Sequence, residues 1–200
     1  MVYWLGADVA VFLASFMLRD RSKPVEQRMA LVPLLRLVDM FPRVTLIAII
    51  PVGLALAWAG RWAALPGWLV GLGFVVGAAW VAVVIRQFRA AVLVFRRADL
   101  VWRVVLMFAA FGLGISSLAG SGPFPGWLGL KVGLFGLILA GGLAIRLIPF
   151  EHALRELARG STPEREDGYA AVQRWVLVPV LTIWGCLVVM TFLSVVKPAL

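Results

Sequence analysis

Six apolar runs, each close to the length of a membrane-spanning helix, restrict the possible folds of this chain more than any other feature of its sequence. A helix needs about 20 apolar residues to cross the hydrocarbon core of a bilayer, with a usable range of about 17 to 25. The runs therefore predict an all-α fold, a polytopic transmembrane helical bundle that forms one domain. The six predicted spans, of which the first is marginal in length, are residues 2–18, 44–60, 67–85, 100–119, 127–148 and 175–196.

The composition indicates that lipid is the main environment of the chain. Only 14% of its residues are charged, whereas soluble domains carry about 25%. The net charge of +9 would suggest nucleic-acid binding in a soluble protein, but here the charges lie between the apolar runs. Anionic headgroups and membrane orientation explain that arrangement better, so we expect the bilayer as a partner and no nucleic acid.

The basic residues predict the orientation of the bundle. Of the 19 Lys and Arg residues, all but Arg61, Lys131 and Lys197 lie in or beside the connectors that follow the first, third and fifth runs. Cytoplasmic loops hold the excess of Lys and Arg. We therefore expect both termini outside, three cytoplasmic connectors and a multi-pass protein of the bacterial inner membrane. The opening run lacks a basic start and a small-residue cleavage site, so we expect it to be retained.

Two of these connectors have helical patterns of their own. Residues 25–41 repeat apolar residues at helical spacing, interrupted by Arg28, which predicts an amphipathic helix at the membrane surface. Residues 151–159 also read as a helix, with Gly160 as its stop. Thr162 before Pro163 is typical of a helix N-cap. The connector between the last two spans should therefore project as a short helical hairpin.

Asp8 is the only acid inside a predicted span, roughly at mid-depth. A charged group there costs about 2.5 to 3.5 kcal/mol on insertion scales, so Asp8 should face the bundle interior and have a partner. Lys131 is a possible partner, although it differs in depth by about 10 Å and a lysine can extend outward more easily. Asp8 could carry a proton or a cation, or it could be a structural acid bonded to a neighbouring helix, which we favour.

Arg36, Asp39 and Arg43 form a second charged group, at the inner end of the second span. Their spacing of i, i+3 and i+7 places them on one face of a helix. We favour an ion-pair ladder at the headgroups, with an anionic-ligand site as the alternative.

The remaining candidate ligands are weak. His152, the lone histidine, could bind a metal or haem, and Cys186 with Met190 at i and i+4 could form a soft copper pair. We expect His152 to be solvated and the other two to pack. A single cysteine excludes an intrachain disulfide and a multi-cysteine metal site. The residues predict no catalytic group and no metal site, and they demand no cofactor.

Small residues at i and i+4 recur in two spans, as Gly129 with Gly133 and Gly73 with Gly77. This spacing lets helix backbones approach closely in lipid. We favour tight internal packing over a homodimer interface.

Two short motifs carry a family resemblance. Tyr3-Trp4-Leu5-Gly6-Ala7, with Phe12 downstream, resembles the first-span W-x-G pattern of CopD-like copper-resistance and HemJ-like haem-pathway membrane proteins. Gly126 to Lys131 (GWLGLK) resembles the Trp-Leu-x-x-Lys of a later span in those families. The resemblance implies a helical bundle and the handling of haem b or copper by intramembrane histidines. The first-span histidine would lie upstream of Met1 and no predicted span contains one, so only the fold expectation is carried over.

Three functions follow as hypotheses. The leading one is a small, non-catalytic integral subunit or accessory protein of a membrane assembly. The first alternative is a proton- or ion-coupled transporter that uses Asp8, for which Ser15, Ser116, Ser117 and Thr182 should face Asp8. The second alternative is a haem b or copper protein of the CopD/HemJ type. As a whole, the chain is similar to small bacterial inner-membrane proteins of this broad type.

Overall fold

The computed structural model describes residues 2–90 and 93–199, with side chains placed for residues 5–89 and 94–199. Met1, and the side chains of Tyr3 and Trp4 that carry part of the family resemblance, lie outside this description. The described residues form nine helices and no strand, which confirms the predicted all-α fold. The helices are α1 (Val2–Met17), α2 (Val25–Met29), α3 (Val32–Val38), α4 (Met40–Ala59), α5 (Gly67–Ala90), α6 (Leu93–Leu118), α7 (Gly126–Leu147), α8 (Phe150–Ala158) and α9 (Pro163–Val196).

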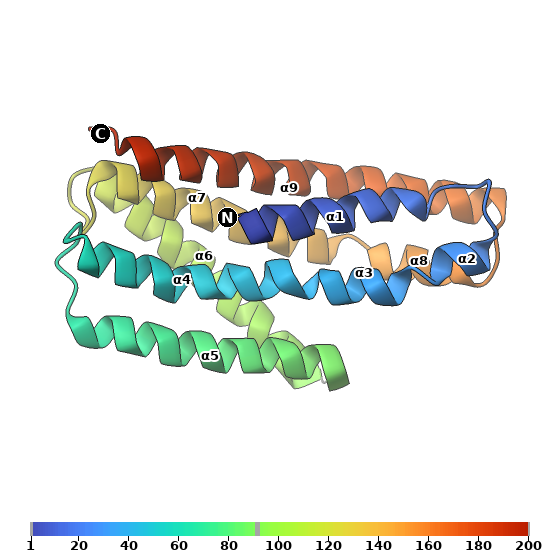
Figure 1. The fold of residues 1–200 in the computed structure, drawn as a ribbon, viewed down its shortest axis with the longest axis horizontal. Coiled ribbons are helices and arrows are strands. Elements are labelled where there is room, and N and C mark those ends of the chain that lie inside the picture. Colours follow the sequence, from blue (N-terminus) through green and yellow to red (C-terminus); the bar gives the residue numbers. More distant parts are fainter. Residues whose placement is uncertain (1, 91–92, 200) are drawn as a thin grey trace.

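Five segments of the described chain are long and apolar enough to cross a membrane: Val25–Ala59, Gly67–Arg89, Val94–Leu118, Gly126–Ala158 and Pro163–Val196. They cover the last five predicted spans to within one residue at each end. The first predicted span is a shorter apolar helix. α1 has 16 residues, about 24 Å at 1.5 Å per residue, against about 30 Å for the hydrocarbon core. It begins beside the middle of α9 rather than at the end of the bundle (Figure 1).

The predicted amphipathic helix over residues 25–41 is divided into α2, α3 and the start of α4. Proline explains both breaks. Pro33 lies in the first turn of α3 and Pro42 in the first turn of α4. Neither has an N–H to donate to the preceding turn, and each ring crowds the carbonyl four residues earlier.

The connector between the last two spans folds as predicted. Ile148 is extended ahead of Pro149, which separates α7 from α8. Gly160 adopts a φ of +136° after α8. The Thr162 hydroxyl accepts a bond from the Arg165 N–H at 3.4 Å and caps α9.

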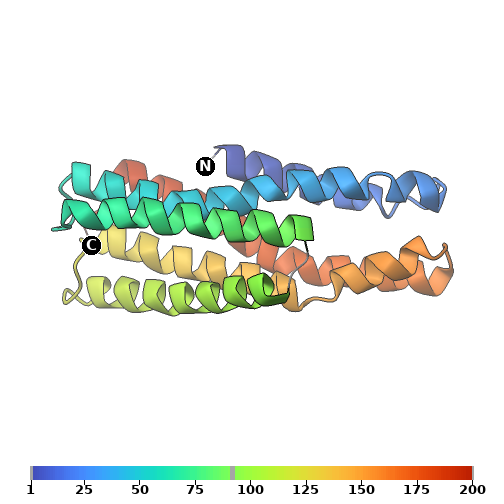
Figure 2. The same ribbon diagram turned by 90° about the horizontal axis from the view of Figure 1, so that it is seen from below.

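The molecule has two regions along its length. α4, α5, α6, α7 and the C-terminal two-thirds of α9 form the bundle. The end of α1, α2, α8 and the start of α9 form a narrower head, which α5 and α6 do not reach in either view (Figures 1 and 2). α9 has 34 residues, about 51 Å, so its first turns, 163–174, extend beyond a hydrocarbon core of about 30 Å. We call the end of the bundle next to the head the basic end, because the Arg-rich connectors lie there.

Glycine allows the closest helix contact in the bundle, between α6 and α7. A Cβ added to Gly114 would lie 2.8 Å from the backbone of Gly133, and one on Gly129 would lie 2.5 Å from the Ser117 Cβ. Gly73 and Gly77 of α5 likewise face Pro51 of α4, where an added Cβ would lie at 3.7 and 3.3 Å. Both glycine pairs thus pack inside the chain, as the internal-packing interpretation predicts.

Candidate functional site

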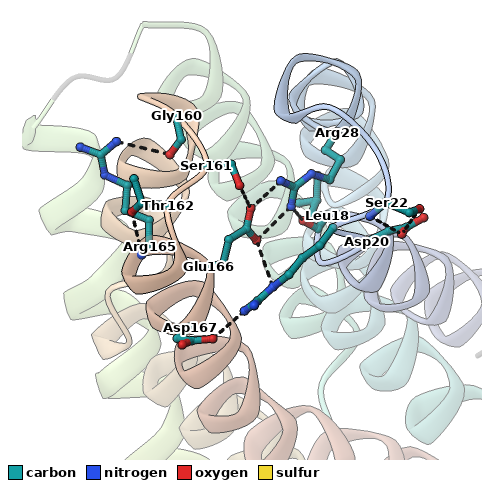
Figure 3. A network of polar contacts seen from close by, with 11 residues as sticks. Leu18, Asp20, Ser22, Arg28, Gly160, Ser161, Thr162, Arg165, Glu166 and Asp167 are labelled. Carbon is teal, nitrogen blue, oxygen red and sulfur yellow. Dashed lines mark hydrogen bonds and ion pairs between the residues drawn. The ribbon is translucent and has the colours of Figure 1, made fainter.

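The head is held together by a buried ion pair between segments far apart in sequence. Arg28 on α2 donates to Glu166 on α9 through both terminal nitrogens, at 3.0 and 2.5 Å, and also to the Leu18 carbonyl at 2.8 Å. The two side chains are only 2% and 4% exposed. Figure 3 shows the two helices meeting at this pair. In the sequence, Arg28 stands out only as an interruption of the apolar repeat over residues 25–41; Arg28 is buried because α9 covers it.

Neighbouring groups complete this pair, which we call the head clasp. The Ser161 hydroxyl donates to Glu166 at 2.6 Å (Figure 3), and Arg21 pairs with exposed Asp167 at 2.5 Å. Glu166 lies outside the membrane-spanning part of α9. The hydrogen bond from Arg28, and then that from Ser161, hold the pKa of this carboxyl below its usual range, although burial opposes them. The buried pair contains one cation and one anion, and Arg21 and Asp167 add one of each, so the clasp is balanced.

A second buried charge cluster lies at the basic end of the bundle, and it is unbalanced. The Asp99 carboxylate on α6 accepts bonds from Trp80 Nε1 at 2.7 Å and Arg103 Nε at 3.1 Å. It also lies 2.6 Å from Arg146 Nη1 on α7. One carboxylate thus serves two guanidinium groups, and Arg103 Nη2 is buried without a hydrogen-bond partner among the described residues. We call this group the Asp99 cluster.

Arg146 connects the Asp99 cluster to a cavity of about 720 Å³ at the basic end. Its walls come from α1, α3, α4, α5, α6, α7, α8 and α9. The ionisable residues of its lining are Asp8, Arg36, Asp39, Arg43, Arg96, Arg97, Arg146 and Glu151. The rest of the lining is apolar apart from Ser15, Gln87 and Gln173. Five arginines and three acids therefore give the lining an excess of positive charge. We call it the basic cavity.

Within the basic cavity, the acids are already paired. Arg36 bonds to Glu151 of α8 at 2.7 Å, and Arg43 bonds to Asp39 at 2.8 Å through Nε. Of the predicted ion-pair ladder, the structure thus forms the pair between Asp39 and Arg43. Arg36 instead pairs with Glu151 and connects α3 to α8. In the part of the chain that the structure describes, no carboxylate lies within 4.0 Å of Arg96 or Arg97. These two arginines carry the uncompensated charge.

The cavity arginines lie at the level expected for lipid headgroups. Arg97 is 21 residues from Leu118 at the far end of α6, and Arg146 is 20 residues from Gly126 at the far end of α7. Each interval corresponds to about 30 Å of helix, one hydrocarbon thickness. We therefore expect the basic cavity to open at the level of the phosphate groups of a bilayer.

Asp8 and Lys131 are not paired with each other. Asp8 lines the basic cavity and accepts a bond from Trp184 Nε1 of α9 at 2.6 Å. Lys131 Nζ bonds to the Ser194 hydroxyl at 2.6 Å, near the opposite end of the bundle. Asp8 thus bonds to a neighbouring helix and also lines a cavity, so its structural role and its role as a proton or cation carrier both stay hypotheses.

The serines and threonine expected around a transport path are scattered. Ser15 shares the basic cavity with Asp8. Ser117 packs against Gly129 near the opposite end of the bundle, and the half-buried Thr182 bonds back to the Val178 carbonyl. Ser116 is also half-buried, and its hydroxyl donates to the Leu113 carbonyl.

The weak candidate ligands are separated. His152 is exposed on α8, whereas Cys186 and Met190 are 6% and 4% exposed in the core of the bundle. Among the described residues, no group of three or more His, Cys, Asp or Glu side chains could hold a metal ion. Another hollow, of about 540 Å³, lies beside the loop after α4 and has Arg61 as its one charged residue.

Sequence reasoning missed the central residues of both buried clusters. Asp99 lies just before a predicted span, although its i, i+4 spacing to Arg103 was a usable signal for a helical ion pair. Glu166 gave no signal beyond its place in the first turn of a capped helix. Gln173 gave none, yet it is 2% exposed, donates to the Ser15 hydroxyl at 2.8 Å and leaves its Oε1 without a partner.

Comparisons with known proteins identify no relative: no family model, no curated protein and no solved structure matches the chain.

Proposed function

We propose that this multi-pass membrane protein is a non-catalytic accessory subunit of a membrane assembly, and that its basic cavity binds an anionic group. The observation that carries the proposal is the charge imbalance of the cavity. Its acids are paired with Arg36, Arg43 or Trp184, while Arg96 and Arg97 have no carboxylate within reach among the described residues. Binding of an anion there would add charge-assisted hydrogen bonds, the stronger kind.

The unbalanced Asp99 cluster supports the same proposal. The buried Arg103 and the half-buried Arg146 share one carboxylate and so leave one net positive charge, which is costly where water is scarce unless it is compensated. Arg146 opens on the cavity and is 23% exposed. An anion beside Arg146 would supply the missing charge. Arginine stays protonated and acts as a donor only, so these groups suit binding better than proton transfer.

Anion binding can be tested by thermal unfolding of the purified protein in a neutral detergent. Inorganic phosphate and a short-chain phosphatidylglycerol are titrated separately, because a ligand at 100 times its Kd stabilises the folded state by about 2.7 kcal/mol. At least one of them should raise the Tm. The Arg96→Gln/Arg97→Gln variant should lose the effect. The control Arg86→Gln/Arg174→Gln variant, with the same charge change at exposed sites outside the cavity, should keep it.

The accessory role has its own test, which is gentle purification from native membranes. Stoichiometric co-elution of membrane proteins is the expected result, and elution of the chain alone would contradict the subunit role. The visible spectrum of the same sample tests the CopD/HemJ hypothesis, because bound haem would give a Soret band.

We propose further that the basic end faces the cytoplasm of a bacterial inner membrane, since basic loops favour that side. In a Cys186→Ala background, a cysteine replacing exposed Arg159 would report on the basic end and one replacing Ser121 on the opposite end. A membrane-impermeant maleimide added to intact cells should label the cysteine at residue 121 alone. Labelling at residue 159 instead would reverse the orientation.

Ion-coupled transport is a second candidate because Asp8 and Ser15 share one cavity. It predicts proton or cation flux in proteoliposomes that Asp8→Asn abolishes. Flux equal to that of empty liposomes would exclude it.

A further inference from the structure

The basic cavity has a polar mouth and an apolar interior. Arg96, Arg97 and Arg146 lie at the headgroup level, while apolar side chains such as Phe12 and Val180 form a deeper wall. Val180 is 16 residues from Val196, about 24 Å along α9, so this wall lies within a hydrocarbon core of about 30 Å. The cavity is thus charged at the headgroup level and apolar deeper in the membrane. A phospholipid has the same order, with a charged headgroup followed by apolar acyl chains.

The size of the cavity also exceeds what a free anion fills. About 720 Å³ is within the range of about 300 to 1,000 Å³ typical of sites for larger organic ligands. An inorganic phosphate at the arginines would leave the apolar wall uncovered, where water has few polar partners. An apolar chain would cover that wall and remove its surface from water.

We propose that the basic cavity binds one anionic phospholipid, with its phosphate at Arg96, Arg97 and Arg146 and an acyl chain along the wall formed by Phe12, Val176 and Val180. The inference rests on the anion site proposed above and names the class of its ligand. Guanidinium groups suit this role because they donate two parallel bonds to phosphate oxygens.

The experiment compares three probes on the purified chain in neutral detergent: short-chain phosphatidylglycerol, phosphatidylcholine with the same acyl chains, and inorganic phosphate. Affinities come from native mass spectrometry for the lipids and from calorimetry for phosphate. The variants are Arg96→Gln/Arg97→Gln at the mouth and Val176→Trp, which fills the apolar wall. The control is Arg86→Gln/Arg174→Gln, and the Tm of every variant is recorded to show that it folds.

The expected result is a phosphatidylglycerol affinity at least about tenfold above those of phosphatidylcholine and phosphate. Both cavity variants should lose about tenfold in lipid affinity, and the control variant should not. Phosphate binding as tight as the lipid and unchanged by Val176→Trp would overturn the lipid inference and leave the anion site standing. Absence of binding by every anion, or equal loss in the control variant, would overturn both proposals.

Discussion

The head clasp and the Asp99 cluster are both built on buried arginine, but they differ in charge balance. In the clasp, Arg28 and Glu166 share two hydrogen bonds, and each is at most 4% exposed. In the Asp99 cluster, one carboxylate serves Arg103 and Arg146, and Arg103 keeps an unpaired nitrogen. A balanced, closed pair is suited to holding helices together. An unbalanced cluster with one arginine open to a cavity is suited to binding.

The largest expected effect comes from breaking the balanced pair. Arg28→Gln should lower the free energy of unfolding by about 3 to 5 kcal/mol, because it leaves Glu166 buried without its partner charge. Denaturant unfolding in detergent measures this loss. Arg21→Gln, which breaks the exposed pair with Asp167, should cost at most about 1 kcal/mol. Equal losses in the two variants would contradict the assignment of Arg28 as the central residue of the head.

The Asp99 cluster should respond unequally to loss of its members. Asp99→Asn leaves the buried Arg103 and the half-buried Arg146 without a carboxylate and should cost about 3 kcal/mol or more. Arg146→Gln leaves Asp99 with Arg103 and Trp80, so its cost should stay near 1 kcal/mol, while phosphatidylglycerol affinity falls. The same unfolding assay compares the two variants. Equal losses of stability in Asp99→Asn and Arg146→Gln would contradict the charge imbalance of the Asp99 cluster.

Packing rather than charge should hold α6 against α7. Gly114→Ala places a methyl group 2.8 Å from the Gly133 backbone, which cannot move aside as a flexible side chain could. The resulting separation of the helices should cost about 1 to 3 kcal/mol. Gly112→Ala, on the same helix with nothing within 4 Å of its added Cβ, is the control and should be neutral or stabilising. A neutral Gly114→Ala would contradict the close helix contact.

Acid should weaken the head clasp before it affects the bundle. The pKa of Glu166 is lower in the folded state than its unfolded value near 4.3. Its contribution to stability is therefore complete above the unfolded pKa and is lost as the pH falls through the folded pKa. Protonated Glu166 still offers a hydrogen-bonding group, so the loss should be smaller than that from Arg28→Gln. Proteolysis of the α8–α9 connector should increase over this pH range in the wild type, with a smaller pH dependence in Glu166→Gln.

The smallest effect on stability is expected at Asp8. Asp8→Asn keeps a carbonyl oxygen that can accept the Trp184 bond, so the cost should be below about 1 kcal/mol. Asp8→Leu removes the acceptor and leaves the indole N–H unpaired, which should cost about 1 to 3 kcal/mol. A large effect of Asp8→Asn on unfolding would show that the charge itself is structural.

Local patterns predicted the fold well. The last five spans follow from length and apolar content, because a backbone in lipid must satisfy its hydrogen bonds within the helix. The α8–α9 hairpin follows from Gly160, Thr162 and Pro163, because caps and breaks depend on neighbouring residues in sequence. The first span was predicted over residues 2–18 with marginal length, and α1 has 16 residues over Val2–Met17, so its crossing of the membrane stays a prediction.

The candidate site was predicted in part. Asp8 and the Arg36, Asp39 and Arg43 group line the basic cavity, but their partners Trp184 and Glu151 lie 176 and 115 residues away in sequence. Helical periodicity shows which face of a helix is apolar, and it cannot show which other helix covers a given residue. For this reason, neither the burial of Arg28 against Glu166 nor the pairing of Asp99 with Arg146 could be foreseen.

By itself, the sequence determined that the chain is a helical membrane bundle with its basic residues gathered in alternate connectors, because lipid excludes charge and unpaired backbone groups from the hydrocarbon. Only the tertiary structure decided which arginines are balanced and which are not. That balance depends on distances between helices, and it separates a closed clasp at Arg28 from a cavity open to an anion beside Arg146.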